Sequence, residues 1–358
     1  MSLFKFIWNE EFWFSNVTDG EAIVWNEFMK QKETGEYFPV ALDLMWSIPF
    51  GFIMILIRRL LQSSVLIKLG YYMGVPKTKG VNIAECSVLE QAYRNGHQND
   101  KRTLEKISKQ TDMSTRQMEI WFRKRAKKDI LTDIQRFTES TWHLFVRGSS
   151  FLIGLFLLWN KPWFWKTKYA WLDWPKHYVF DDIYCYYILE LSIYWHLIFN
   201  LLMDHKRKDF WLSAVHHFCT IVLMYFGWVL NFVRIGTFIL LVHDASDPWV
   251  DLGKILVYSK KKRSSEIVFV IFVFVWLLSK DGIYPFILLN STTFEAYKYL
   301  PVTNYMLIFF NVFLYILMIL HIMWTYNIFE VIVNKLRHGE LKDVRSESEH
   351  DSGDTDGE

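Results

Sequence analysis

The sequence predicts an all-α membrane protein: a polytopic bundle of about seven spanning helices with a small helical cytoplasmic insert. Three observations predict this fold class. Hydrophobic residues make up 52% of the 358 residues and aromatic residues 18%, which is more apolar than an ordinary soluble domain. Apolar stretches of about 20 residues, enough helix to cross about 30 Å of hydrocarbon, recur along the chain. One polar block between the first two stretches is long enough for a small domain.

The spanning helices are expected wherever an apolar stretch reaches the length that crossing requires. The third to fifth stretches contain ionisable side chains, and the second is short. The first dozen residues lack the unbroken apolar run and cleavage site of a signal peptide, so the first span, within residues 39–61, is expected to start insertion itself. We predict spans at residues 39–60, 144–161, 180–203, 210–230, 236–258, 266–290 and 303–330.

Lys and Arg residues in the short loops predict the orientation, because basic loops stay on the cytoplasmic side. If seven spans alternate, the basic groups all fall on one side of the membrane. The N-terminus is then lumenal and the C-terminus cytoplasmic. The basic groups are Arg58, Arg59, the segment 101–128, the runs 205–208 and 260–263, Lys335 and Arg337.

The two ends of the chain are predicted to lie on opposite sides of the membrane. Residues 1–38 form a lumenal segment with the sequon Asn16-Val-Thr, so Asn16 is a predicted glycosylation site. A second sequon begins at Asn290, close to the predicted membrane edge. Residues 336–358 are predicted to be a disordered cytoplasmic tail, because the run from Lys342 is acidic and almost free of apolar side chains.

The polar block, residues 76–129, is predicted to fold as a small helical domain. Residues 103–110 are typical of one helix and residues 117–125 of a second, with a turn and an N-cap between them. The spacing of the apolar positions resembles that of a homeodomain core. These positions are Leu89, Tyr93, Leu104, Trp121 and Phe122, with Glu90 beside the first.

Two departures from the homeodomain pattern argue against base-specific DNA reading. Lys124 stands where the family has the Asn that reads adenine, and the basic arm that enters the minor groove is truncated. We therefore expect a structural or regulatory module, and DNA is not an expected partner. Anionic lipid headgroups are the alternative partner of its basic run, at about 1 kcal/mol per basic residue near the surface. That run consists of Arg123, Lys124, Arg125, Lys127 and Lys128.

The fifth predicted span, residues 236–258, carries five ionisable side chains on one face. At 100° per residue they fall within an arc of about 100°. Each Asp or Lys at bilayer depth costs about 2.5 to 3.5 kcal/mol on insertion scales, so this face is predicted to line the bundle interior or a wet cavity. Pro248 is predicted to kink the helix. The five residues are His243, Asp244, Asp247, Asp251 and Lys254.

A second polar stripe lies on the fourth predicted span. Two interpretations stay open for its adjacent histidines: they take part in chemistry with the facing acids, or they only hydrogen-bond between helices. The stripe consists of Ser213, His216, His217 and Thr220, and the third span adds Asp182 and Glu190 as candidate cavity residues and His196 as a structural one.

The region that holds these stripes, residues 140–335, resembles the TLC domain, and residues 191–258 resemble the Lag1 motif of ceramide synthases. A homeodomain-like insert before a TLC domain is typical of animal ceramide synthases. The tail run 343–349 resembles their C-terminal motif, with a Glu in place of an Asp. The matching runs are Trp211-Leu-Ser-Ala-Val-His-His, Leu241-Val-His-Asp-Ala-Ser-Asp-Pro and Asp251-Leu-Gly-Lys.

This resemblance implies a ceramide synthase of the endoplasmic reticulum membrane. Such an enzyme acylates the amine of a sphingoid base with a fatty acyl-CoA to give ceramide or dihydroceramide. The implied partners are these two substrates and membrane lipids, with no metal and no cofactor, since acyl-CoA is a substrate. The implied catalytic residues are His216, His217, His243, Asp244 and Asp247, and the implied substrate-binding residues are Asp251, Ser213, Lys254 and Asp182.

These residue types suit the reaction because the amine arrives protonated, with a pKa of about 10, and needs a base before it can attack the thioester. His216 or His217 is the candidate base. The alternative is that one imidazole attacks the thioester and forms an acyl-histidine. We expect Asp244 or Asp247 to orient the working imidazole, and Asp251 to attract the ammonium group or to complete this network.

Other function classes fit less well or stay open. A di-iron lipid hydroxylase needs HxxxH and HxxHH-like boxes, which the sequence lacks. The open alternative is a non-enzymatic TLC-type protein that binds lipid or assists membrane-protein handling, with the insert as a regulator. The sequence also leaves open the sphingoid base, homo- or heterodimer formation, and the acyl-chain length, for which the resemblance points to residues 289–303.

Overall fold

The computed structural model describes residues 39–77, 84–95, 101–111, 113–129, 132–175, 177–203, 209–300 and 304–338. Helices dominate these ranges, and no strand occurs within them. The all-α prediction is confirmed. Asn16, the rest of the segment 1–38, and the tail from residue 339 onward lie outside the described residues, so what we expected of them stays a prediction.

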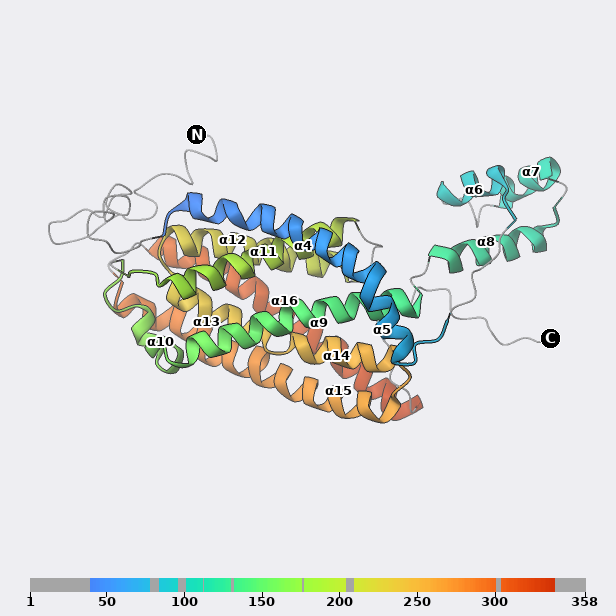
Figure 1. Ribbon diagram of the computed structural model, residues 1–358. Helices are drawn as coiled ribbons and strands as arrows, with labels where there is room; N and C mark the ends of the chain where they lie inside the picture. The colour runs from blue at the N-terminus through green and yellow to red at the C-terminus, as the bar shows by residue number, and fades with distance from the viewer. Residues whose placement is uncertain are drawn as a thin grey trace, which may run out of the picture.

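Within the described ranges, six helical segments are long and apolar enough to cross a membrane, and they run side by side in one bundle (Figure 1). The chain is a multi-pass membrane protein. The segments are Ala41–Tyr72, Asp133–Trp159, Asp181–Met203, Phe210–Val229, Lys262–Lys298 and Tyr305–Arg337. Their elements are η2 (Ala41–Trp46), α4 (Ser47–Leu61), η3 (Gln62–Leu66), α5 (Ile67–Tyr72), α9 (Asp133–Trp159), α11 (Asp181–Met203), α12 (Phe210–Val229), α15 (Lys262–Trp276), η6 (Leu277–Leu289), η7 (Ser291–Glu295), η8 (Ala296–Lys298) and α16 (Asn304–His338).

The fifth predicted span, residues 236–258, is two short helices, α13 (Val233–Asp244) and α14 (Asp247–Tyr258). Pro248 lies in the first turn of α14, where its missing N–H and fixed φ are tolerated. In a helix interior its ring would clash with the preceding turn. The prediction of one kinked helix was therefore wrong, and the count of seven spans stays a prediction.

Together, α13 and α14 follow the whole length of α9. At one end the ring centroid of Phe238 lies 5.4 Å from that of Phe164, which follows α9. At the other end Lys260 Nζ lies 3.7 Å from a carboxylate oxygen of Asp133. Midway, Arg147 of α9 contacts the start of α14. The broken helix thus takes the path of a single span and places its break inside the bundle.

The π-helical element η6 continues α15 and contains Pro285. A π turn holds one more residue than an α turn, and such turns are frequent at functional sites. Here it carries Lys280 into the interior, where the side chain is buried. A lysine inside a span is costly unless it has partners, so its surroundings bear on function.

The tryptophan-rich loop between α9 and α11 contains α10 (Pro162–Trp165) and η5 (Thr167–Ala170). Trp171 Nε1 donates a hydrogen bond to Ser291 Oγ at 2.8 Å, which ties the loop to η7. Trp163, Trp171 and Trp174 are buried as protein core.

The insert consists of α6 (Ser87–Arg94), α7 (Lys101–Thr111) and α8 (Thr115–Asp129) around a hydrophobic core of its own. The two helices predicted there are confirmed as α7 and α8. Four of the predicted core positions, Leu89, Leu104, Trp121 and Phe122, are buried, and Tyr93 packs against them.

We had expected Arg125 of α8 to belong to a free basic surface, but it does not. Its Nε and Nη2 donate to the two carboxylate oxygens of Glu90, at 2.7 and 2.9 Å. Arg123 and Lys124, by contrast, are exposed. The basic run therefore divides into a residue that joins two helices of the insert and residues that face outward.

Candidate functional site

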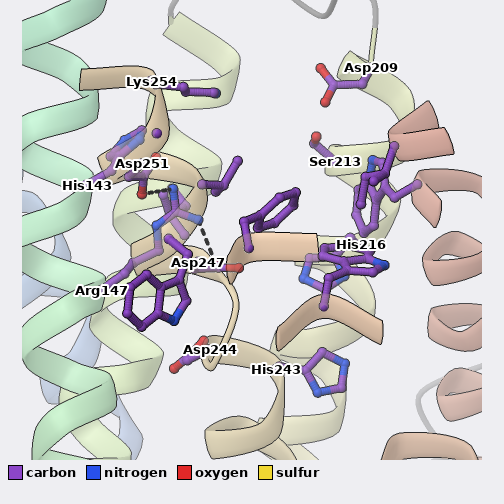
Figure 2. A pocket seen from close by; sticks show the side chains of 18 of the residues that line it. His143, Arg147, Asp209, Ser213, His216, His243, Asp244, Asp247, Asp251 and Lys254 are labelled. Carbon is purple, nitrogen blue, oxygen red and sulfur yellow. Dashed lines mark hydrogen bonds and ion pairs between the residues drawn. The ribbon is translucent and has the colours of Figure 1, made fainter. Parts of the chain in front are cut away.

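A cavity of about 690 Å³ lies inside the bundle, between α9, α11, α12, α13, α14, α15, η6 and α16. Figure 2 shows Asp209 and Lys254 toward one end of it and His243 toward the other. Most of the site residues that we predicted gather here. They are Ser213, His216, His217, His243, Asp244, Asp247, Asp251 and Lys254.

The break between α13 and α14 brings the acidic side chains to the cavity. His243 and Asp244 end α13, and Asp247 begins α14. We expected these groups on one face of a continuous helix. They converge for a different reason, because two helix ends meet at this point and both point their polar side chains into the same space (Figure 2).

Arg147 of α9 binds two of the aspartates. Its Nη1 lies 2.6 Å from Asp247 Oδ2 and its Nη2 lies 2.8 Å from Asp251 Oδ2. We had expected Asp244 or Asp247 to orient an imidazole, and Asp251 to attract the ammonium group of the substrate or to complete that network. The structure gives the carboxylates of Asp247 and Asp251 to the guanidinium, whose planar fork suits two oxygen acceptors.

The remaining aspartate, Asp244, faces a second acid. Glu190 of α11 receives a hydrogen bond from Ser150, and the Asp244 carboxyl lies within hydrogen-bonding reach of it. Both acids are buried. In the described residues no hydrogen bond joins Asp244 or Asp247 to an imidazole, so the expected Asp–His orientation is absent from this structure.

Four imidazoles lie next to one another in the cavity, from α12, α13 and α16. Ring centroids are 5.5 Å apart between His216 and His217, 6.1 Å between His216 and His243, and 4.9 Å between His243 and His321. The Nδ1 atoms of His216 and His217 are buried without a partner in the described structure. Within the described ranges no group of His, Cys, Asp and Glu is arranged to hold a metal ion.

His243 is fixed in one tautomer by its own helix. Its Nδ1 lies 2.9 Å from the carbonyl oxygen of Ile239, and a carbonyl can only accept a hydrogen bond. In the neutral ring the proton is therefore on Nδ1 and the lone pair on Nε2. That Nε2 is buried and has no partner in the described part of the chain. His243 thus presents a free base to the cavity.

Lys280 closes the end of α13. Its Nζ donates to the carbonyl oxygen of His243 and lies 5.7 Å from the centroid of the Trp276 ring. The last carbonyls of a helix lack partners within the helix, and a cation is favourable at that end. Lys280 therefore holds the helix end that carries His243.

Arg147, Lys280 and His321 are cavity residues that we had not predicted. Each lies in a predicted apolar span but outside the polar stripes of the third to fifth spans, whereas we looked for several polar groups on one face. The cost of a charge inside the membrane applies to each one alone. Applied residue by residue, that argument would have found at least the two cations.

A second, smaller cavity of about 60 Å³ adjoins the first at His243, which lines both. Its other walls are mostly apolar and come from α12, α13 and α16. Thr220, which we placed on the histidine stripe, lines this cavity. The polar and the apolar space therefore meet at one imidazole.

Two residues of α11 lie apart from the cavity. Asp182, an expected substrate-binding residue, has a carboxylate oxygen 3.2 Å from Lys161 Nζ and does not line it. His196 Nε2 accepts a hydrogen bond from Trp142 Nε1 at 2.9 Å and lies 2.8 Å from the Asn200 amide nitrogen. These contacts are those of a structural histidine.

Comparison with known proteins gives two family matches. The homeodomain model matches residues 81–129, and the TLC domain model matches residues 136–330, more than half of the chain. The chain is also similar over nearly its full length to curated proteins. It is 32% identical to ceramide synthase 5 of Homo sapiens, over 99% of this chain and 89% of that protein.

Two other relatives agree. The chain is 32% identical to ceramide synthase 3 of Mus musculus, over 96% of this chain and 88% of that protein. It is 30% identical to ceramide synthase 4 of Bos taurus, over 99% of this chain and 88% of that protein. The resemblance drawn from the motifs is confirmed: the chain belongs to the TLC-domain family and, within it, to the ceramide synthases.

Proposed function

We propose that this chain is an acyl-CoA-dependent N-acyltransferase that joins a fatty acyl group to the amine of a sphingoid base, forming ceramide or dihydroceramide. One observation carries the proposal: imidazoles with unpartnered nitrogens lie inside a membrane cavity, where a polar space meets an apolar one. The names of the similar proteins, all ceramide synthases, support it.

Each part of acyl-CoA has a counterpart in the site. We assign the acyl chain to the second cavity, whose walls are mostly apolar and which must widen to hold it, since about 60 Å³ is the volume of only a few methylenes. The CoA nucleotide must stay in water, so we assign it to the end of the large cavity near Asp209 and Lys254 (Figure 2). The thioester then lies near His243, where the two spaces meet. This places the scissile C–S bond beside free imidazole nitrogens.

The chemistry requires the amine to lose protons. The ammonium form has no lone pair, so one proton leaves before the nitrogen attacks the thioester carbon and a second leaves once the C–N bond exists. The C–S bond breaks, and the CoA thiolate takes up one proton. His216 or His217 is the base in this route. In the alternative, one of them attacks the carbon first, and the amine then displaces it from the acyl-imidazole.

The aspartates take different roles from those we expected. Asp247 and Asp251 form a fixed unit with Arg147, so neither is free to receive the ammonium group. Asp244 has no cation within ion-pair distance among the described residues and lies beside Glu190. We therefore assign the attraction of the ammonium group to Asp244, supported by Glu190.

We also propose a location and an orientation. The basic loops predict that the insert and the C-terminus face the cytoplasm and that the N-terminus faces the lumen. We place the protein in the endoplasmic reticulum membrane, with Asn16 open to glycosylation. Mobility shifts on glycosidase treatment, compared between the wild type and Asn16→Gln, test the lumenal position. An unshifted wild-type band would contradict it.

Separate substitutions of the two motif histidines test the proposed function. We expect His216→Ala and His217→Ala each to lower acyl-CoA-dependent N-acylation in microsomes by about 1000-fold or more, because base or nucleophile is lost. His196→Gln is the matched control, since this buried histidine lies apart from the cavity. Wild-type rates in both variants would remove the mechanism. Lipid binding by a wild type that has no acylation activity would favour the non-enzymatic alternative.

The insert is proposed to be a structural or regulatory module. Its exposed Lys124 replaces the base-reading Asn of homeodomains. We expect the full-length protein in detergent to show no sequence preference among DNA duplexes in a competition assay. A preference above about tenfold, lost on Lys124→Ala, would overturn this assignment.

A further inference from the structure

His321 lies on α16, outside the motif that carries the other histidines, and its side chain is 0% exposed. It lines the large cavity, and its ring centroid is 4.9 Å from that of His243 and 5.0 Å from that of Tyr284. Neither ring nitrogen has a hydrogen-bond partner among the described residues. An imidazole in this position has one N–H and one lone pair free for a group that enters the cavity.

Packing alone does not explain this histidine. A buried polar group without a partner lowers stability, and a Phe would fill similar space without that cost. His196 shows the structural alternative, because its Nε2 accepts from Trp142 and lies beside Asn200. His321 has the burial of His196 without its hydrogen bonds, as expected of a group whose partner arrives with the substrate.

The proposed N-acylation gives such an imidazole a task. Two protons leave the amine nitrogen in each turnover, one before attack and one after the C–N bond has formed. The departing CoA thiolate takes one of them, and water takes the other. A single imidazole holds one additional proton at a time. The site must therefore offer a second acceptor or clear the first one before the reaction ends.

We propose that His321 is the outer residue of a proton relay with His243. His243 Nε2, whose lone pair is free because Nδ1 carries the proton, accepts the second proton from the amine nitrogen. Because these nitrogens are not hydrogen-bonded to each other in the described structure, the imidazolium passes this proton from Nε2 through a water molecule in the cavity to the unprotonated nitrogen of His321, and His243 returns to its neutral form. His321 gives the proton to the CoA thiolate or to water in the cavity. This inference rests on the proposed function.

Several titratable groups face His321 from the elements packed around it. Their titration could also change the rate with pH, so the effect of His321 has to be distinguished from theirs. They are His216 on α12, His243 on α13, and Lys280 and Tyr284 on η6. Lys280 contacts the backbone of His243 and leaves its ring free. Of these groups, the His243 ring is the one that combines close packing against the His321 ring with a lone pair fixed on its free nitrogen.

The test is the pH dependence of turnover in the purified full-length protein with sphinganine and a saturated acyl-CoA. We expect His321→Phe and His321→Gln to lower kcat by about 100-fold near neutral pH, with both KM values within about twofold. The loss should shrink as the pH rises toward about 9, because hydroxide then accepts the proton that the relay no longer removes. Added imidazole should restore part of the rate to His321→Gly, whose cavity it can enter.

His196→Gln is the matched control, since it alters a buried histidine that lies outside the cavity. It should leave the shape of the pH profile unchanged. A His321 loss of equal size at every pH, without rescue by imidazole, would assign His321 to packing and overturn the relay. Absence of acylation by the wild type would instead overturn the proposed function, so the two failures are distinguishable. Thermal unfolding of each variant in detergent separates misfolding from loss of proton transfer.

Discussion

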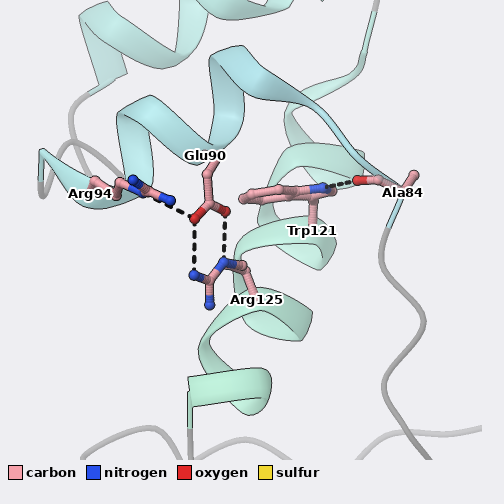
Figure 3. A network of polar contacts seen from close by, with 5 residues as sticks. All are labelled: Ala84, Glu90, Arg94, Trp121 and Arg125. Carbon is pink, nitrogen blue, oxygen red and sulfur yellow. Dashed lines mark hydrogen bonds and ion pairs between the residues drawn. The ribbon is translucent and has the colours of Figure 1, made fainter. Parts of the chain in front are cut away.

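The helical insert and the membrane cavity both bury polar side chains, and they differ in how those side chains are paired. In the insert, Trp121 Nε1 donates to the carbonyl oxygen of Ala84 at 2.7 Å, and Arg125 and Arg94 both donate to Glu90 (Figure 3). Each of these groups has a partner, the Trp121 ring being buried and Arg94 remaining exposed. The insert thus uses polar contacts to join its helices around a small core.

Among the described residues of the cavity, acids and cations are paired, whereas several imidazole nitrogens are not. Arg147 binds Asp247 and Asp251, whereas His243 and His321 keep unpartnered nitrogens. A paired polar group stabilises one fold, and an unpartnered buried one costs stability while it keeps its capacity to react. We infer from this contrast that the cavity is arranged for chemistry and the insert for structure.

Arg147→Met should have the largest effect on stability, because it leaves Asp247 and Asp251 buried without their cation. Loss of one partner from a buried ion pair costs about 3 to 5 kcal/mol. We expect a lower thermal midpoint for detergent-solubilised protein and loss of N-acylation. The triple variant Arg147→Met, Asp247→Asn, Asp251→Asn should recover most of the stability and little of the activity. An unchanged midpoint for Arg147→Met would contradict the structural role of this ion-pair unit.

The sequence predicted the site only where polar residues form a pattern along one helix. The His216–His217 pair and the acids of the fifth span contrast with apolar surroundings, and eight of the nine implied catalytic and substrate-binding residues meet in one cavity. Their pairing could not be predicted, because the partner of Asp247 and Asp251 comes from α9, about one hundred positions earlier. Long-range contacts of this kind leave no periodic signal in the sequence.

The sequence likewise predicted part of the fold and missed part of it. Hydropathy located the membrane helices because crossing sets their length, and local spacing located the core of the insert around Trp121. The break in the fifth span was missed, since Pro248 is compatible both with a kink and with the first turn of a new helix. Only the packing of both halves against α9 decides between these two structures.

Gly236→Val should have an intermediate effect, limited to the acyl chain. Gly236 lines the small apolar cavity, and a Cβ there would meet only ordinary contacts at 3.7 Å from Tyr187. The added methyl groups fill space that we assign to the acyl chain. We expect kcat/KM for the longest accepted acyl-CoA to fall about 10- to 100-fold, with a smaller loss for shorter chains, in an assay across chain lengths.

Gly148→Val on α9 is the matched control for this substitution. Its Cβ would also meet ordinary contacts, at 3.7 Å from Leu144, and Gly148 does not line the small cavity. It should leave the order of acyl-chain preference unchanged. Equal losses at all chain lengths for Gly236→Val would argue that the small cavity does not hold the acyl chain.

Glu90→Gln should have the smallest effect, confined to the insert and dependent on pH. Hydrogen bonds from Arg125, and also from Arg94, lower the pKa of Glu90 from 4.5 to about 2. Because the folded-state pKa is depressed, the carboxylate stabilises the insert fully above pH 4.5, and this contribution is lost as the pH falls toward about 2. Near neutral pH we expect limited proteolysis within the insert to be about two- to fivefold faster in the variant, with N-acylation nearly unchanged.

The pH dependence separates this ion pair from a general loss of charge. The difference in proteolysis between the wild type and Glu90→Gln should shrink below pH 4.5, because protonation removes the same charge from the wild type. Glu119→Gln, an exposed residue of α8, is the matched control and should not alter cleavage. If Glu90→Gln lowered acylation as strongly as Arg147→Met, the insert would be coupled to the reaction, and the contrast between a structural insert and a reactive cavity would fail.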